Sequence, residues 1–171
     1  MANKLASGLV NDVGRLREKS LPIDMTDEVT KTNVKNALIE MYNKLDGKLQ
    51  GLAAIQCDLA YRAILLRYKK GIEPVVVYNP RVLFKTLLVD SHEGCLSEGG
   101  GRWWIQRPML ARVEYYDYEG IRHREWLTWK KARIFCHECD HLDGILLQDK
   151  GKVDTRFAAD GTYTKSSFRR K

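Results

Sequence analysis

Residues 137–141 read His-Glu-Cys-Asp-His, so two histidines stand four positions apart with a glutamate between them. Side chains at this spacing share one face of an α-helix, with Cβ atoms about 5–6 Å apart, so both imidazoles can reach one metal ion. Glu138 then lies beside the water that such an ion would carry, in the position of a general base. The stretch 127–142 contains no Gly or Pro, and Gly144 follows it, which predicts a helix that ends there. The alternative is a chance pattern on an ordinary surface helix.

Hydrolysis at such a metal also needs a third protein ligand and a donor for the oxyanion. Cys95 in the segment Glu-Gly-Cys-Leu-Ser is the candidate ligand, because Gly94 permits close backbone approach and the glycine-rich stretch beyond predicts a strand end. Gln56, the last residue of Gly-Leu-Ala-Ala-Ile-Gln, carries an amide that can donate to an oxyanion. The alternatives are a small buried thiol at Cys95 and an exposed Gln56 at the start of an Ala-rich helix.

Taken in this order, the three segments resemble the signature of the peptide deformylase family, which reads Gly-x-Gly-x-Ala-Ala-x-Gln, Glu-Gly-Cys-Leu-Ser and His-Glu-x-Asp-His. The second and third match at every fixed position, whereas Leu49 replaces the first glycine of the first. The resemblance extends from about Arg15 to Asp149. It implies a hydrolase that removes the N-formyl group from the N-terminal methionine of newly made proteins and releases formate. The alternatives are an amidase of the same mechanism with a different N-formyl or N-acyl substrate, and an inactive deformylase-like binding protein.

The resemblance implies one catalytic divalent metal ion per chain, bound by Cys95, His137 and His141. A thiolate with two imidazoles suits Fe²⁺ or Zn²⁺, with Ni²⁺ as a further candidate, and the residues do not choose between them. The implied catalytic groups, which act on the water, the leaving amine or the oxyanion, are Glu138, Gln56 and the backbone N–H of Leu96. Glu93 would orient a ligand or the Cys95 loop, and Asp140, which faces away from the metal, would pair with Arg107. The alternative for these residues is ordinary surface charge.

The substrate-binding positions depart from the apolar methionine pocket of the family. Its walls come from the residue before the second glycine of the first motif, the residue two before Glu-Gly-Cys, and the helix ahead of His-Glu. These positions here hold polar or cationic residues, namely Gln50, Ser91, Lys130 and Arg133. Gly51 and Arg102 complete the expected substrate contacts. Because an unpaired buried cation is costly, either the long side chains turn outward over methylene walls or the pocket accepts a polar or acidic group.

Length and composition limit the remaining classes of protein. The 171 residues suit a single catalytic domain over 1–171, with a flexible basic tail from about residue 154. No apolar stretch is long enough to span a membrane and residues 1–20 lack a signal-peptide core, so we expect a cytoplasmic protein with no membrane partner. Cys136 and Cys139 would need a second cysteine pair to form a structural zinc site.

The net charge of +7 is concentrated in clusters that include 130–133 and 165–171. A basic tail suits a protein that works near ribosomal RNA, so the expected partners are an N-formylated peptide and, through the tail, a ribosome. No basic motif interleaved with aromatic residues is apparent, and we expect no specific DNA. The alternative is a solvated tail without a partner.

The patterning predicts an α+β domain with antiparallel strands packed around a central helix that carries the HExxH motif. Apolar residues at helical spacing predict a helix at about 30–44. Strand-like runs occupy 63–68, 75–78, 82–84 and 112–116. A turn at 117–120 joins the last run to a hairpin partner at 122–127. The resemblance implies the same arrangement.

Overall fold

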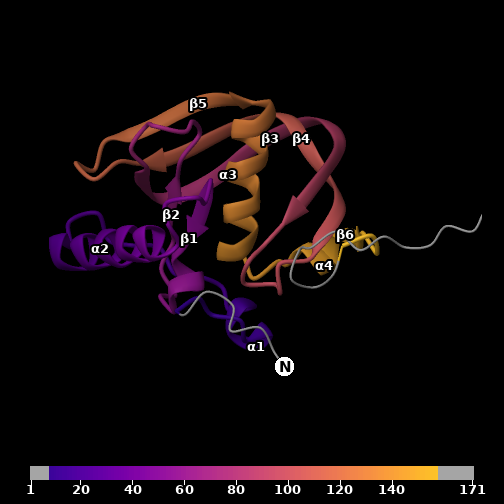
Figure 1. The fold of residues 1–171 in the computed structure, drawn as a ribbon. Helices are drawn as coiled ribbons and strands as arrows, with labels where there is room; N and C mark the ends of the chain where they lie inside the picture. Colours follow the sequence, from indigo (N-terminus) through magenta and orange to yellow (C-terminus); the bar gives the residue numbers. More distant parts are fainter. Residues whose placement is uncertain (1–7, 158–171) are drawn as a thin grey trace, which may run out of the picture.

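The computed structural model of the chain describes residues 8–157. Figure 1 shows helix α3 in the middle of the molecule, with β1 and β2 on one side of it, while the long strands β3 and β4 run past α3 from that side to the other. The elements in chain order are α1 (Val13–Leu16), α2 (Glu28–Lys44), β1 (Gly51–Ala53), the 3₁₀ turn η1 (Ala54–Cys57), β2 (Ala63–Leu66), β3 (Val75–Gly94), β4 (Arg102–Tyr116), β5 (Arg122–Thr128), α3 (Trp129–Leu142), α4 (Leu147–Lys150) and β6 (Gly151–Val153).

The strands form one antiparallel sheet in the order β1-β2-β3-β4-β5, and β6 pairs with β4 at the end opposite to β5. β3 and β4 pair along their length, from Tyr78 opposite Tyr116 to Gly94 opposite Arg102. Two register shifts, one after Tyr78 and one after Val82, interrupt this ladder. Such bulges bend a strand and increase its twist, and the bent sheet wraps around α3 (Figure 1).

These strands are longer than the sequence pattern predicted. The runs 75–78 and 82–84 are parts of one strand that continues to Gly94, and β4 begins ten residues before 112, at Arg102. The segment added to β3, 85–94, is largely exposed, and in the segment added to β4 the residue types do not alternate, since Trp103, Trp104 and Ile105 follow one another. Their backbone is held by pairing with each other, which single-segment patterns do not reveal.

The two long helices lie close to the predicted positions. α2 begins at Glu28, two residues before the expected start, because the side chain of Asp27 accepts a hydrogen bond from the Thr30 N–H at 2.9 Å. α3 begins at Trp129, since residues 127 and 128 complete β5. It ends before Gly144, whose φ of 71° lies in the left-handed region that favours glycine. The α+β class with a central helix is therefore confirmed.

The main core lies between α3 and the concave face of the sheet. Phe135, Cys136 and Cys139 on α3 pack there with Ala111, Val113 and other apolar side chains of the strands. Both cysteines are free and buried, and within residues 8–157 no second cysteine pair accompanies them. They therefore serve as small apolar side chains on the face of α3 opposite its histidines.

The segment after β6 is held against the sheet. The N–H of Asp154 donates to the carbonyl of Arg102 at 2.7 Å, and its carboxylate accepts from Trp104 Nε1 at 3.2 Å. The structure describes only the first residues of the predicted tail, as far as 157, and the basic cluster 165–171 lies outside the described residues. Across residues 8–157, no helix has the length and apolar character needed to cross a membrane.

Candidate active site

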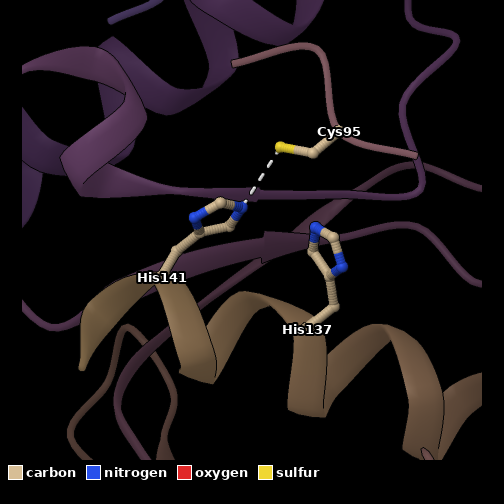
Figure 2. A group of neighbouring side chains, drawn as sticks. All are labelled: Cys95, His137 and His141. Atoms are coloured by element: carbon tan, nitrogen blue, oxygen red, sulfur yellow. Dashed lines mark hydrogen bonds between the residues drawn. The ribbon is translucent and has the colours of Figure 1, made fainter. Parts of the chain in front are cut away.

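The three candidate metal ligands lie close together between the end of β3 and helix α3, namely Cys95, His137 and His141. Their potential ligand atoms all lie within 4.8 Å of one another, and Cys95 Sγ is 3.3 Å from His141 Nε2. Figure 2 shows both imidazoles rising from successive turns of α3 toward the thiol. Three side chains of this kind match a catalytic zinc or iron site that keeps a position open for water or substrate. The donor set thus fits one divalent cation.

The loop after β3 fixes the position of Cys95. The carbonyl of Cys95 accepts hydrogen bonds from the N–H of Glu98 at 3.3 Å and of Gly100 at 2.9 Å. Gly99 and Gly100 have φ values of 82° and 74°, so the chain turns back into β4 with backbone angles that other residues rarely adopt. The Glu98 carboxylate accepts from the N–H of Leu147 at 2.9 Å, which ties the loop to α4.

A buried set of charges orients the histidines. Glu93 Oε2 lies 2.9 Å from His137 Nδ1, and because this carboxylate can only accept, the imidazole donates from Nδ1 and presents Nε2 to the site. Arg107 donates to both oxygens of Glu93 at 3.0–3.1 Å and also pairs with Asp140 on α3. Burial opposes ionisation of Glu93, but the hydrogen bond from His137 and the charge of Arg107 lower its pKa to about 2. The expected pairing of Arg107 with Asp140 is present.

The two imidazoles differ in their environments. Burial lowers the pKa of His141 well below its usual range, which keeps this ring neutral as a metal ligand requires. Burial also favours the neutral form of His137, but hydrogen bonds with Cys95 and Glu93 raise its pKa well above the usual range. Binding of a cation at His137 would therefore release a proton.

Glu138 lies beneath β1 with its carboxyl beside the cluster. The side chain is buried, and within residues 8–157 its Oε2 has no hydrogen-bond partner. Burial raises the pKa of this carboxyl to about 7, against the opposing charges of His137 and Arg107. A Cβ built on Gly51 would lie 2.3 Å from Glu138 Oε1, so glycine at this position makes room for the carboxyl. A carboxyl so placed can accept a proton and return it near neutral pH.

Gln56 presents its amide nitrogen to the site. Its Oε1 accepts from the N–H of Ala53 at 2.9 Å, and its Nε2 donates to Ser97 Oγ at 3.1 Å and lies 3.6 Å from Cys95 Sγ. The side chain is buried, and the segment before it is strand β1 followed by one 3₁₀ turn. The alternative of an exposed Gln56 in an Ala-rich helix is therefore wrong. The sequence motif contained Ser97 but gave no reason to assign it this contact.

A cavity of about 390 Å³ opens beside these groups. Its lining includes Cys95, His137, Glu138 and Gln56, so the candidate catalytic groups all face one space. Apolar lining comes from Leu9, Leu49, Leu96 and Ile134, and further polar or cationic lining comes from Lys48, Gln50, Arg102 and Arg133. The cavity therefore has the volume of a ligand-binding pocket, and its lining is partly apolar and partly polar or cationic.

The profile of the polypeptide deformylase family matches residues 9–156. The chain belongs to this family. The peptide deformylase of Finegoldia magna is 35% identical over 136 residues, which cover 79% of this chain and 82% of the relative. The peptide deformylase of Rickettsia prowazekii is 34% identical over 148 residues, with 79% and 81% covered. Among solved structures, the Plasmodium falciparum peptide deformylase has a TM-score of 0.75 and 30% identity, with 84% of this chain and 86% of that chain covered.

The substrate positions expected for a deformylase are only partly assembled. Gln50, Gly51, Arg102 and Arg133 line the cavity. Lys130 is exposed and is not part of the lining, and neither is Ser91, which is buried and donates to Glu93 Oε1 at 2.8 Å. The idea of long side chains turned outward thus fits Lys130 but not Arg133.

Proposed function

We propose that the chain, as a peptide deformylase, removes the N-formyl group from the N-terminal methionine of newly made proteins and releases formate. The observation that carries the proposal is the buried Glu138 carboxyl, which lacks a partner on Oε2 and lies beside the cluster of Cys95, His137 and His141. An unpaired buried carboxyl destabilises a fold, so a protein that only bound ligands would have no use for it. The family and the relatives at about 35% identity support the same activity.

Cys95, His137 and His141 would hold one divalent metal ion, Fe²⁺ or Zn²⁺, with Ni²⁺ also compatible with these donors. Such an ion supplies a Lewis acid that lowers the pKa of water to near neutrality. Glu138 takes the proton of the attacking water and delivers it to the leaving amine. One carboxyl suffices for both transfers, because burial raises its pKa toward neutrality and its Oε2 has no other hydrogen-bond partner within residues 8–157.

Gln56 and the backbone N–H of Leu96 would donate to the oxygen of the formyl group as it gains negative charge. The backbone of Ala53 holds the Oε1 of Gln56, so its Nε2 faces the cavity before substrate arrives. A donor fixed in this way needs no reorganisation during the reaction, and one such donor is worth about 10²–10³ in rate. Glu93, Arg107 and Asp140 act on the reaction only by holding the histidines in place.

The expected setting of the enzyme follows from its substrate. An N-formylated peptide is the partner that this cavity would receive, and the cytoplasm, where such peptides emerge, is the proposed location. The basic cluster at 165–171 would favour contact with a ribosome through phosphate groups.

The test is release of formate from formyl-Met-Ala-Ser by protein purified without oxygen and supplied with Fe²⁺. Glu138→Gln keeps the shape of the side chain and removes the base, so turnover should fall by about 10³-fold or more while metal content stays unchanged. Glu114→Gln is the matched control, because Glu114 is also a buried glutamate but pairs with Arg124 on β5, outside the lining of the cavity. A protein with one metal ion per chain that releases no formate would contradict the proposal.

A further inference from the structure

Arg133 is the cationic side chain of the cavity that lies nearest to the metal cluster along α3. It precedes His137 by one helical turn, so the two side chains occupy the same face of the helix. Both line the same cavity. The Nη1 of Arg133 donates to Ser91 Oγ at 3.3 Å, which holds one arm of the guanidinium at the cavity wall.

The charge of Arg133 is poorly compensated. Its Nε lies 4.0 Å from Glu93 Oε1, beyond hydrogen-bonding distance. That carboxylate already accepts three hydrogen bonds from Arg107 and one from His137. A guanidinium has five N–H donors, and within residues 8–157 the described hydrogen bonds of Arg133 engage one of them. Donors therefore remain for a ligand.

The surroundings of Arg133 favour an acceptor rather than an apolar group. The cavity lining also includes Lys48, Gln50 and Arg102, whereas of its two carboxyl groups Glu93 is paired with Arg107 and Glu138 is the proposed base. The side chain of Arg133 is 38% exposed, so a substrate group can reach it through the open side of the cavity. An apolar side chain placed there would remove water from the guanidinium without offering a hydrogen bond in return.

We propose that Arg133, with Gln50 in the lining of the same cavity, forms a polar subsite for the first side chain of the formylated substrate. The subsite accepts methionine, whose thioether sulfur is a weak acceptor, and it favours a side chain that ends in a carboxylate or amide, such as glutamate or glutamine, over an apolar chain of the same length. This proposal rests on the deformylase activity and names a substrate class for it. Arg133 thereby acts on specificity and takes no part in the chemical step.

The experiment compares kcat/KM for formyl-Xaa-Ala-Ser peptides in which Xaa is methionine, norleucine, glutamine or glutamate. The decisive quantity is the ratio of kcat/KM for the glutamate peptide to kcat/KM for the norleucine peptide, because these two side chains have similar lengths. Arg133→Leu should lower this ratio by about 10- to 100-fold, as expected for the loss of a charge-assisted hydrogen bond. Lys130→Leu, which changes an exposed cation on the same helix, should leave the ratio unchanged.

Two further measurements protect the test from a variant that fails to fold. Arg133→Lys keeps the charge but not the forked donors, and it should retain part of the preference for glutamate. Titration of wild-type protein with the product peptides Glu-Ala-Ser and norleucyl-Ala-Ser needs no variant, and the glutamate peptide should bind more tightly. A wild-type preference for norleucine that Arg133→Leu leaves unmoved would overturn the subsite. Metal-loaded protein that hydrolyses none of the peptides would instead refute the activity, and product binding would still decide the subsite.

Discussion

The substitution Gly51→Ala, which adds a single methyl group, should strongly lower the activity of the enzyme without unfolding it. A Cβ added to Gly51 would meet Oε1 of Glu138 at 2.3 Å and both Cγ and Cδ at 2.7 Å. Contact distances between such atoms begin near 3.5 Å, so the carboxyl must move by about 1 Å. Because Glu138 is buried, the carboxyl cannot simply swing into solvent, and the whole end of the side chain must shift. A misplacement of about 1 Å costs about 10²-fold in rate, which is the loss in kcat/KM that we expect for Gly51→Ala.

Stability and metal content should respond much less. Gly51 does not have a positive φ, so alanine fits its backbone, and the cost is that of mild overpacking, about 1–3 kcal/mol. Formate release, metal analysis and urea unfolding on the same preparations separate these effects. Gly101→Ala is the control, since its added Cβ would meet nothing closer than Trp103 Nε1 at 3.8 Å.

A double-mutant cycle identifies the cause. Glu138→Asp shortens the side chain by one methylene and withdraws it from position 51. If the clash explains the loss, adding Gly51→Ala to Glu138→Asp should cost much less than it does in the wild type. Additive losses, or a Gly51→Ala enzyme with full activity and an unmoved Glu138, would refute the reasoning.

Two further predictions concern stability. The pKa of Glu93 is about 2, below its ordinary value of 4.5, so ionised Glu93 contributes about 3 kcal/mol that is present above pH 4.5 and lost as the pH falls toward 2. Urea unfolding between pH 2 and 6 should therefore show a shallower pH dependence for Glu93→Gln, and an unchanged slope would contradict this. Gly144→Ala should destabilise the protein by several kcal/mol, because φ is 71° and the Cβ would lie 2.2 Å from the carbonyl oxygen of Arg17. Gly120→Ala, with φ of 81° and open space, should cost only about 1 kcal/mol in the same assay, and equal losses would argue against the clash.

The candidate metal site could be predicted because it depends on short-range spacing. The one-turn separation of His137 and His141 fixes their common face, and the glycines around Cys95 predict the end of a strand. The partners of Gln56 could not be predicted in this way. Its burial depends on β1 pairing with β2 and on the loop at Ser97, 41 residues away in sequence, and neither contact leaves a local pattern.

Sequence spacing was also insufficient to predict which residues of α3 line the cavity. Lys130 and Arg133 both project toward the face of α3 that carries His137, since seven and four residues are close to whole turns. Their axial distances from His137 differ, at about 10 Å and 6 Å. Spacing gives the face but not how far the cavity extends along it, so only Arg133 reaches the lining.

The guanidinium of Arg107 links three elements at once, because it lies on β4 and binds Glu93 on β3 and Asp140 on α3. Sliding α3 along the sheet would separate these charges inside the protein, which is strongly unfavourable. Folding alone therefore fixes the position of both imidazoles relative to the sheet. Capture and exchange of the metal then become local events at the open side of the cavity, without a refolding step. Metal-free protein should accordingly unfold in one cooperative transition and recover its metal at a rate that the concentration of the ion controls.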